Sequence, residues 1–129
     1  MSNYATGKQV QLDFDTAVTR VTEELAKVGF GVLTEIDVAA TLKKKLDLNV
    51  PPYRILGACN PQFASKALAM EPQIGALLPC NVVVRQDESG KNYVEFMDPN
   101  AVLGLVNRPE IASIATEVRG RLMQVIDAL

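Results

Sequence analysis

Apolar residues recur at helical spacing in two long segments of the chain. In the first, steps of three and four residues gather the apolar positions on one face of a helix: Phe14, Val18, Val21, Leu25 and Val28. Asp13 is the expected N-cap of this helix, and Gly29 is expected to end it in a left-handed conformation. Near the C-terminus we expect Asn107 to cap a second long helix, with Glu110 at the capping-box position before one apolar stripe: Ile111, Ile114, Val118, Leu122, Val125 and Leu129.

Five shorter segments predict strands, of which the first is polar but suits a strand. They cover residues 4–11, 31–36, 53–59, 81–86 and 91–97. The third run is mostly apolar, which is typical of a strand buried in the middle of a sheet. The turn sequence DESG at residues 87–90 joins the last two runs as a hairpin.

Three shorter helices complete the pattern. Asp37 is expected to cap a helix that runs to Leu46, and Asn60 to cap a helix that starts with Pro61. A third short helix is predicted at residues 98–105. The order is therefore β-α-β-α-β-α-β-β-α-α, and the hairpin excludes an all-parallel sheet. We predict one α+β domain spanning residues 1–129, with one sheet and helices packed mainly on one of its faces.

Composition narrows the possible functions. The chain of 129 residues has a net charge of −2 and contains no histidine. The absence of histidine excludes Ser-His-Asp and Cys-His catalysis and the zinc signatures that contain histidine. Two cysteines are too few for a zinc site within one chain, so we expect no metal and lean towards a protein that is not an enzyme. The cofactor, if there is one, stays unspecified.

Charge and hydropathy also bear on partners and location. The longest basic run, at residues 43–45, is too short to indicate a nucleic-acid partner. No apolar run approaches the ~18 residues of a membrane span, and the N-terminus lacks the pattern of a signal peptide. We therefore expect a cytoplasmic protein that has no membrane partner and keeps its cysteines reduced.

A Cys-Asn pair occurs twice, as Cys59-Asn60 and Cys80-Asn81. Cys59 ends a predicted strand just before a helix, where the positive end of the helix dipole favours a thiolate. If the two strands are antiparallel neighbours, the two thiols can meet; if the strands are parallel, the thiols lie at opposite edges. The alternative interpretation treats both cysteines as small buried hydrophobes and Asn60 as a cap.

Glu35 is the remaining candidate for a binding site. It lies in an otherwise apolar strand, where a carboxylate that faces a pocket would have a perturbed pKa. Exposure on the solvent side of that strand is the favoured alternative, since Asp and Glu are seldom buried. The candidate ligand-binding residues are thus Glu35, Cys59, Asn60, Cys80 and Asn81.

Three stretches of the sequence together resemble family 302 of the domains of unknown function. They are residues 29–37 (GFGVLTEID), 53–61 (YRILGACNP) and 78–84 (LPCNVVV), and the MDP sequence at residues 97–99 and the last helix fit as well. The resemblance implies a curved, largely antiparallel sheet with helices, similar to the TATA-binding-protein arrangement. It also implies bacterial or archaeal cytosolic proteins that form homodimers. It implies no activity, cofactor or catalytic residue.

Two functions are consistent with these observations. The first is a small-molecule-binding or homodimeric assembly module without catalysis of its own, with apolar surface for a dimer near Leu103, Leu105 and Val106. The second is a thiol-based redox or sulfur-handling protein, with Cys59 as the reactive thiolate and Cys80 as its resolving partner.

Overall fold

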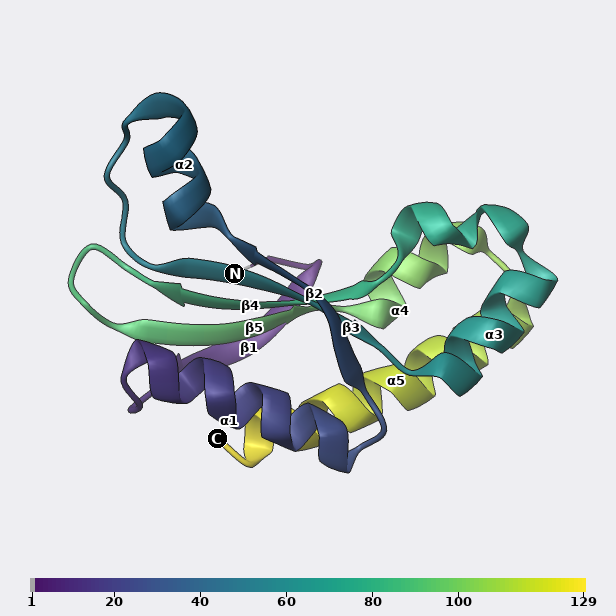
Figure 1. The fold of residues 1–129 in the computed structure, drawn as a ribbon. Coiled ribbons are helices and arrows are strands. Elements are labelled where there is room, and N and C mark those ends of the chain that lie inside the picture. Colours follow the sequence, from purple (N-terminus) through teal and green to yellow (C-terminus); the bar gives the residue numbers. More distant parts are fainter. Residues whose placement is uncertain (1) are drawn as a thin grey trace.

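Five strands form one antiparallel sheet in the computed structural model, which describes residues 2–129. The strand order across the sheet is β1-β5-β4-β3-β2. The strands are β1 (Ala5–Val10), β2 (Gly31–Asp37), β3 (Tyr53–Cys59), β4 (Cys80–Gln86) and β5 (Asn92–Met97). This arrangement confirms the predicted α+β class, the order of elements and the antiparallel sheet, and the ribbon in Figure 1 shows its twist.

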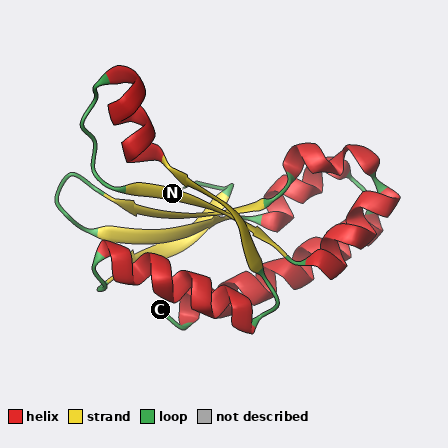
Figure 2. Cartoon of the chain, viewed as in Figure 1, coloured by secondary structure: helices red, strands yellow, loops and turns green. Residues whose placement is uncertain are grey.

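Two long helices cover one face of the sheet. They are α1 (Phe14–Lys27) and α5 (Pro109–Asp127), which run along the same side of the strands in Figure 2. Both present apolar residues at helical spacing to the sheet, and alternate residues of the central strands meet them. The main hydrophobic core therefore lies between this helix pair and β3, β4 and β5: among its members are Ala17, Val21, Leu25, Leu56, Val82, Val84, Val94, Phe96 and Leu122.

A second, smaller core lies beyond one end of the sheet. Here α3 (Pro61–Met70), the 3-10 helix η1 (Pro72–Leu77), α4 (Pro99–Val102) and the 3-10 helix η2 (Leu103–Val106) gather around the first half of α5. Its buried members are Ala67, Ile74, Leu103, Ile111 and Ala115. Helix α5 is long enough to join both cores.

Helix α2 (Val38–Leu46) projects from the opposite end of the sheet (Figure 1). None of its residues is buried, and its principal contact is with β3. No helix in the described part of the chain is both long enough and apolar enough to cross a membrane.

Most predicted helix ends are confirmed, with one clear error. Asp13, Asp37 and Asn60 each accept a hydrogen bond from a backbone N–H of the helix that they cap. Asn107 does not cap α5: it adopts a left-handed conformation, with φ of 56°, and ends η2. Arg108 occupies the N-cap position without a side-chain cap, and Glu110 pairs with the Arg108 guanidinium at 2.9 Å. Asparagine tolerates the left-handed region, so the same residue type suits a helix stop as well as a start.

Two further expectations change in detail. The short helix predicted at residues 98–105 is α4 followed by η2, rather than one helix. In the apolar surface that was expected for a dimer, Leu103 is 3% exposed and belongs to the second core, whereas Leu105 is 76% exposed.

Candidate functional site: an apolar cavity with two thiols

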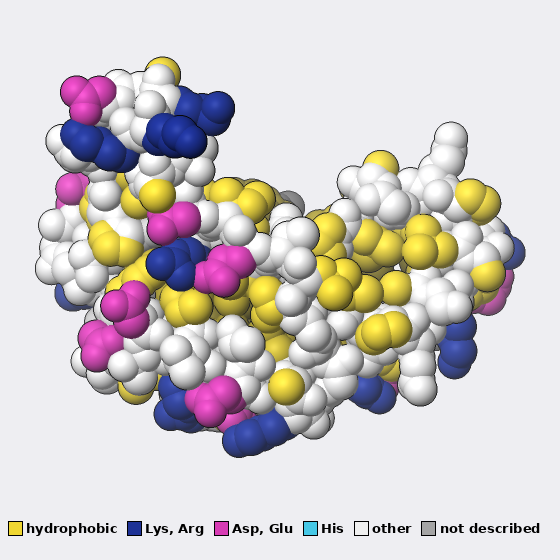
Figure 3. Space-filling model, viewed as in Figure 1, with side chains coloured by type: hydrophobic (Ala, Val, Ile, Leu, Met, Phe, Trp, Pro, Cys, Tyr) yellow, Lys and Arg dark blue, Asp and Glu magenta, His cyan; other side chains and the backbone are white. Residues whose placement is uncertain are grey.

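An apolar cavity of about 330 Å³ lies where the two cores meet. Its walls come from the start of β2, the junction of β3 with α3, the inner face of α3, the segment from η1 to β4, and one face of α5. On the face shown in Figure 3, hydrophobic side chains gather in a hollow at this end of the molecule. The lining residues that matter most below are Phe30, Leu33, Thr34, Cys59, Asn60, Phe63, Ala64, Leu68, Gly75, Leu78, Cys80 and Leu103.

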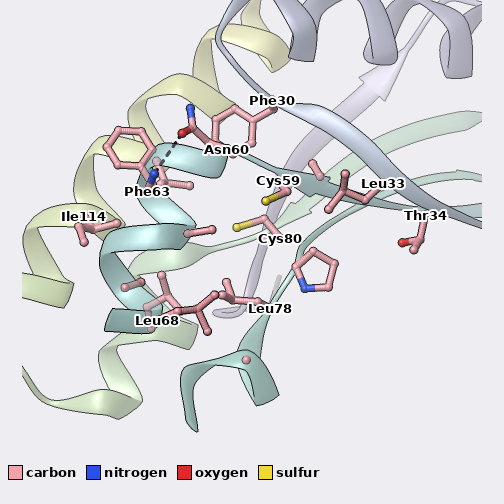
Figure 4. A pocket seen from close by; sticks show the side chains of 17 residues that line it. Phe30, Leu33, Thr34, Cys59, Asn60, Phe63, Leu68, Leu78, Cys80 and Ile114 are labelled. Carbon is pink, nitrogen blue, oxygen red and sulfur yellow. Dashed lines mark hydrogen bonds between the residues drawn. The ribbon is translucent and has the colours of Figure 1, made fainter. Parts of the chain in front are cut away.

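The two cysteines enter the cavity because β3 and β4 are antiparallel neighbours. In their register Ala58 lies opposite Cys80, so the end of β3 meets the start of β4. Figure 4 shows the two sulfurs directed to the same side, into the cavity. Both thiols are free, and Cys80 is buried whereas Cys59 is half-buried. Of the two arrangements that the sequence left open, the structure has the one in which the thiols can meet.

Asn60 fixes the turn from β3 into α3. Its side-chain oxygen accepts a hydrogen bond from the Phe63 N–H at 3.1 Å, and Pro61 follows at the first helical position. The Asn60 amide also lies close to Gly29, where a Cβ would come within 2.9 Å of Nδ2. Gly29 has a φ of 87°, so the end of α1 and the start of α3 require a glycine there for two reasons. Asn60 thus has a structural role that positions Phe63 against the cavity.

A β-bulge shapes the mouth of the cavity. The pairing of β2 with β3 shifts between Val32 and Thr34, which leaves Leu33 as the extra residue. Leu33 lines the cavity although 69% of its surface is exposed, and Leu68 on α3 lines it with 42% exposed. Large apolar side chains that are both exposed and part of a cavity wall indicate an opening that an apolar molecule could cover.

The electrostatics of the cavity are simple, because none of its lining residues is charged. Burial raises the pKa of the Cys80 thiol to about 11, and the nearby Cys59 adds to this increase. Cys80 is therefore a neutral thiol at neutral pH. An uncharged, apolar environment favours an uncharged, apolar ligand, since burying a charge without a partner is costly.

The other two candidate residues lie outside the cavity. Glu35 is exposed and its carboxylate binds the Arg54 guanidinium at 2.7 Å, so the favoured alternative of an exposed side chain describes it. Asn81 is exposed on β4 opposite Gly57, on the other face of the sheet from Cys80. The structure therefore brings together Cys59, Asn60 and Cys80, and separates them from Glu35 and Asn81.

Local sequence patterns did not predict the rest of the cavity wall. Leu33 was placed in an ordinary strand at residues 31–36. The bulge that exposes Leu33 depends on the pairing of β2 with β3, and no local pattern encodes it. Helix α3 contributes Phe63, Ala64 and Leu68 to the cavity wall, while Phe63 also packs against the main core and Ala67 belongs to the second core.

Comparison with known proteins identifies relatives but no activity. No curated protein matches the chain. The crystal structure of an uncharacterized conserved DUF302 protein from Bacillus stearothermophilus is similar, with a TM-score of 0.90, 31% sequence identity and 98% of each chain covered. The model of the DUF302 family, a domain of unknown function, matches residues 6–129. This match covers nearly the whole sequence, including both cysteines and every wall of the cavity, so the chain belongs to the DUF302 family.

Proposed function

We propose that this protein is a small-molecule-binding module, and that its ligand is an uncharged, mainly apolar molecule held in the cavity between the two cores. The observation that carries this proposal is the cavity itself, which is apolar and uncharged and opens between Leu33 and Leu68. Its volume of about 330 Å³ falls within the range of about 300–1,000 Å³ that is typical of ligand pockets.

The absence of histidine supports binding rather than catalysis by the common nucleophile systems. Among residues 2–129 no group of three or more His, Cys, Asp or Glu side chains could hold a metal ion. The cavity wall holds few polar groups, the principal ones being the Thr34 hydroxyl, the Asn60 amide and the two thiols. A ligand with one weakly polar group and an apolar body therefore suits it best.

The test uses two fluorescent probes that differ in charge. N-phenyl-1-naphthylamine is neutral, and 1-anilinonaphthalene-8-sulfonate is the same ring system with a sulfonate. We expect the neutral probe to bind one site per chain with increased fluorescence, and the anionic probe to bind much more weakly. Equal binding of both probes, or binding of neither, would contradict the proposal.

A matched pair of variants locates the binding site. Gly75 lines the cavity, and a Cβ there would meet only Leu68, at an ordinary contact distance of 3.9 Å. Gly75→Leu should therefore add apolar volume to the cavity, with room for its Cβ, and abolish binding of the neutral probe. Gly104 also lies in a 3-10 helix, but a Cβ there would meet nothing within 4 Å and the residue does not line the cavity. Gly104→Leu should bind the probe as the wild type does.

Thiol chemistry is the second candidate, because Cys59 and Cys80 share the cavity. It is the weaker of the two, since the thiolate is the reactive form and burial raises the pKa of Cys80 to about 11. Assembly into a homodimer is a separate proposal, for which exposed Leu105 is the remaining support from the predicted surface.

A further inference from the structure

We propose that the ligand of the cavity carries one hydroxyl group at the end of an apolar body, and that Thr34 binds this hydroxyl at the mouth of the cavity. The inference rests on the proposed function and names the class of ligand, a neutral alcohol or phenol with a single hydroxyl. Three observations carry it: the position of the Thr34 side chain, the state of the other polar groups in the wall, and the apolar interior.

The Thr34 side chain lies at the mouth of the cavity. Thr34 directly follows the β-bulge at Leu33, lines the cavity and is exposed, and Figure 4 shows it on the same side of the cavity as Leu33. The residue opposite it on β3 is the buried Gly57, where a Cβ would overlap the Thr34 Oγ1. The hydroxyl therefore lies in the space that is left because Gly57 has no side chain.

The other polar groups of the cavity wall are less suited to bind a ligand hydroxyl. Asn60 is 7% exposed, its side-chain oxygen already accepts a backbone N–H of α3, and its amide nitrogen lies close to Gly29. The two thiols are weak hydrogen-bonding groups, and Cys80 is buried. The Thr34 hydroxyl has no hydrogen-bond partner among residues 2–129. Because a hydroxyl both donates and accepts, it can pair with a ligand hydroxyl in either direction.

The interior of the cavity determines how such a ligand is oriented. Its most buried lining residues are all apolar and at most 3% exposed: Phe30, Ala58, Ala67, Leu103 and Val118. An apolar body that enters this space is removed from water, which favours binding in proportion to the area buried. A hydroxyl in the same place would exchange its hydrogen bonds with water for apolar contacts, which is costly. The favoured orientation therefore keeps the hydroxyl beside Thr34 and the apolar body inside.

The test compares two compounds that differ in one group. 4-Ethylphenol carries a hydroxyl and is neutral at pH 7, and 4-ethyltoluene has a methyl group in its place. Each compound is titrated against bound N-phenyl-1-naphthylamine in the wild type, Thr34→Val and Thr34→Ser. We expect Thr34→Val to weaken displacement by 4-ethylphenol roughly two- to tenfold, the effect of losing one hydrogen bond between neutral groups, without weakening displacement by 4-ethyltoluene. Thr34→Ser keeps a hydroxyl and should bind 4-ethylphenol as the wild type does.

Four results would overturn the inference. Thr34→Val weakens both compounds equally, which would mean that shape rather than a hydrogen bond matters, or it weakens neither; Thr34→Ser behaves as Thr34→Val does; or 4-ethylphenol fails to displace the probe from the wild type. Binding of N-phenyl-1-naphthylamine to the wild type reports separately on the proposed function, so the failure of the two ideas can be told apart. Thr34 is exposed on the edge strand β2, and probe binding by each variant checks that its cavity is intact.

Discussion

Burial of Cys80 determines the protonation state of one of the two thiols in the cavity wall. The side chains of Cys80, Val82 and Val84 lie on the inner face of β4, and all three belong to the main core. The residue opposite Cys80 on β3 is the buried Ala58. Burial disfavours the charged thiolate, which raises the pKa of Cys80 to about 11 from an ordinary value of 9.0. The thiol is therefore neutral near neutral pH and packs as a small hydrophobe.

The raised pKa predicts a loss of stability in alkaline solution. The folded state binds the Cys80 proton more tightly than the unfolded chain does. The contribution of this proton to the free energy of unfolding is therefore fully present below pH 9 and disappears as the pH rises towards 11. Two pKa units correspond to roughly 2–3 kcal/mol. We expect the difference in free energy of unfolding between wild type and Cys80→Ala to fall by up to about this amount, measured by urea titration from pH 8 to 11. Parallel curves for the two proteins would mean that the thiol ionises equally in both states.

At the scale of elements, caps and periodicity explain why much of the fold was predictable. Asp13, Asp37 and Asn60 act where the sequence placed them, because a cap bonds a backbone N–H only a few residues away. The prediction that Asn107 caps α5 was wrong for a physical reason, because asparagine is suited both to an N-cap and to the left-handed residue that ends a helix. The direction and neighbours of β3 and β4, and the bulge at Leu33, depend on distant pairing, so the cavity was not predictable from local pattern.

Helix α2 should be the least stable helix of the fold. It has no buried residue and depends on its Asp37 cap, whose oxygen accepts a hydrogen bond from the Ala40 N–H at 2.9 Å. Backbone amides with few buried contacts around them open at low free energy. We expect hydrogen exchange followed by mass spectrometry to show faster exchange in α2 than in α1 or α5.

Two substitutions at Asp37 separate the cap from the charge. Asp37→Ala removes the cap, at a cost of about 0.5–2 kcal/mol to the helix, and should speed exchange in α2 further. Asp37→Asn keeps a capping oxygen while losing the carboxylate that lies 3.4 Å from Arg54, so it should retain most of the protection. The prediction that α2 is the least stable helix fails if α2 exchanges as slowly as α5. The role given to the Asp37 cap fails if both variants lose protection equally.

At the scale of the whole molecule, the cavity lies between two cores that one helix connects. Phe30, Cys80 and Val118 belong to the main core, Ala67 and Leu103 to the second, and all five line the cavity. A ligand bound there would contact both cores at once. Helix α5 contributes buried residues to each core, so the stability of the cavity wall depends on both cores. The contribution of each core can be measured separately by substitutions at different positions along α5.

Ile111 and Leu122 provide the comparison, because both are fully buried on α5 but in different cores. Truncation to alanine should cost about 2–5 kcal/mol at either site. We expect Leu122→Ala to lower protection from hydrogen exchange throughout the sheet, α1 and α5. Ile111→Ala should lower it mainly in α3, η1 and the first half of α5, and weaken binding of the neutral probe while β4 and β5 stay protected. The second core packs against α5 rather than against the sheet, so its loss need not unfold the strands. If Ile111→Ala exposes the sheet as much as Leu122→Ala does, the two cores form one cooperative unit, and the cavity is part of that unit rather than a boundary within it.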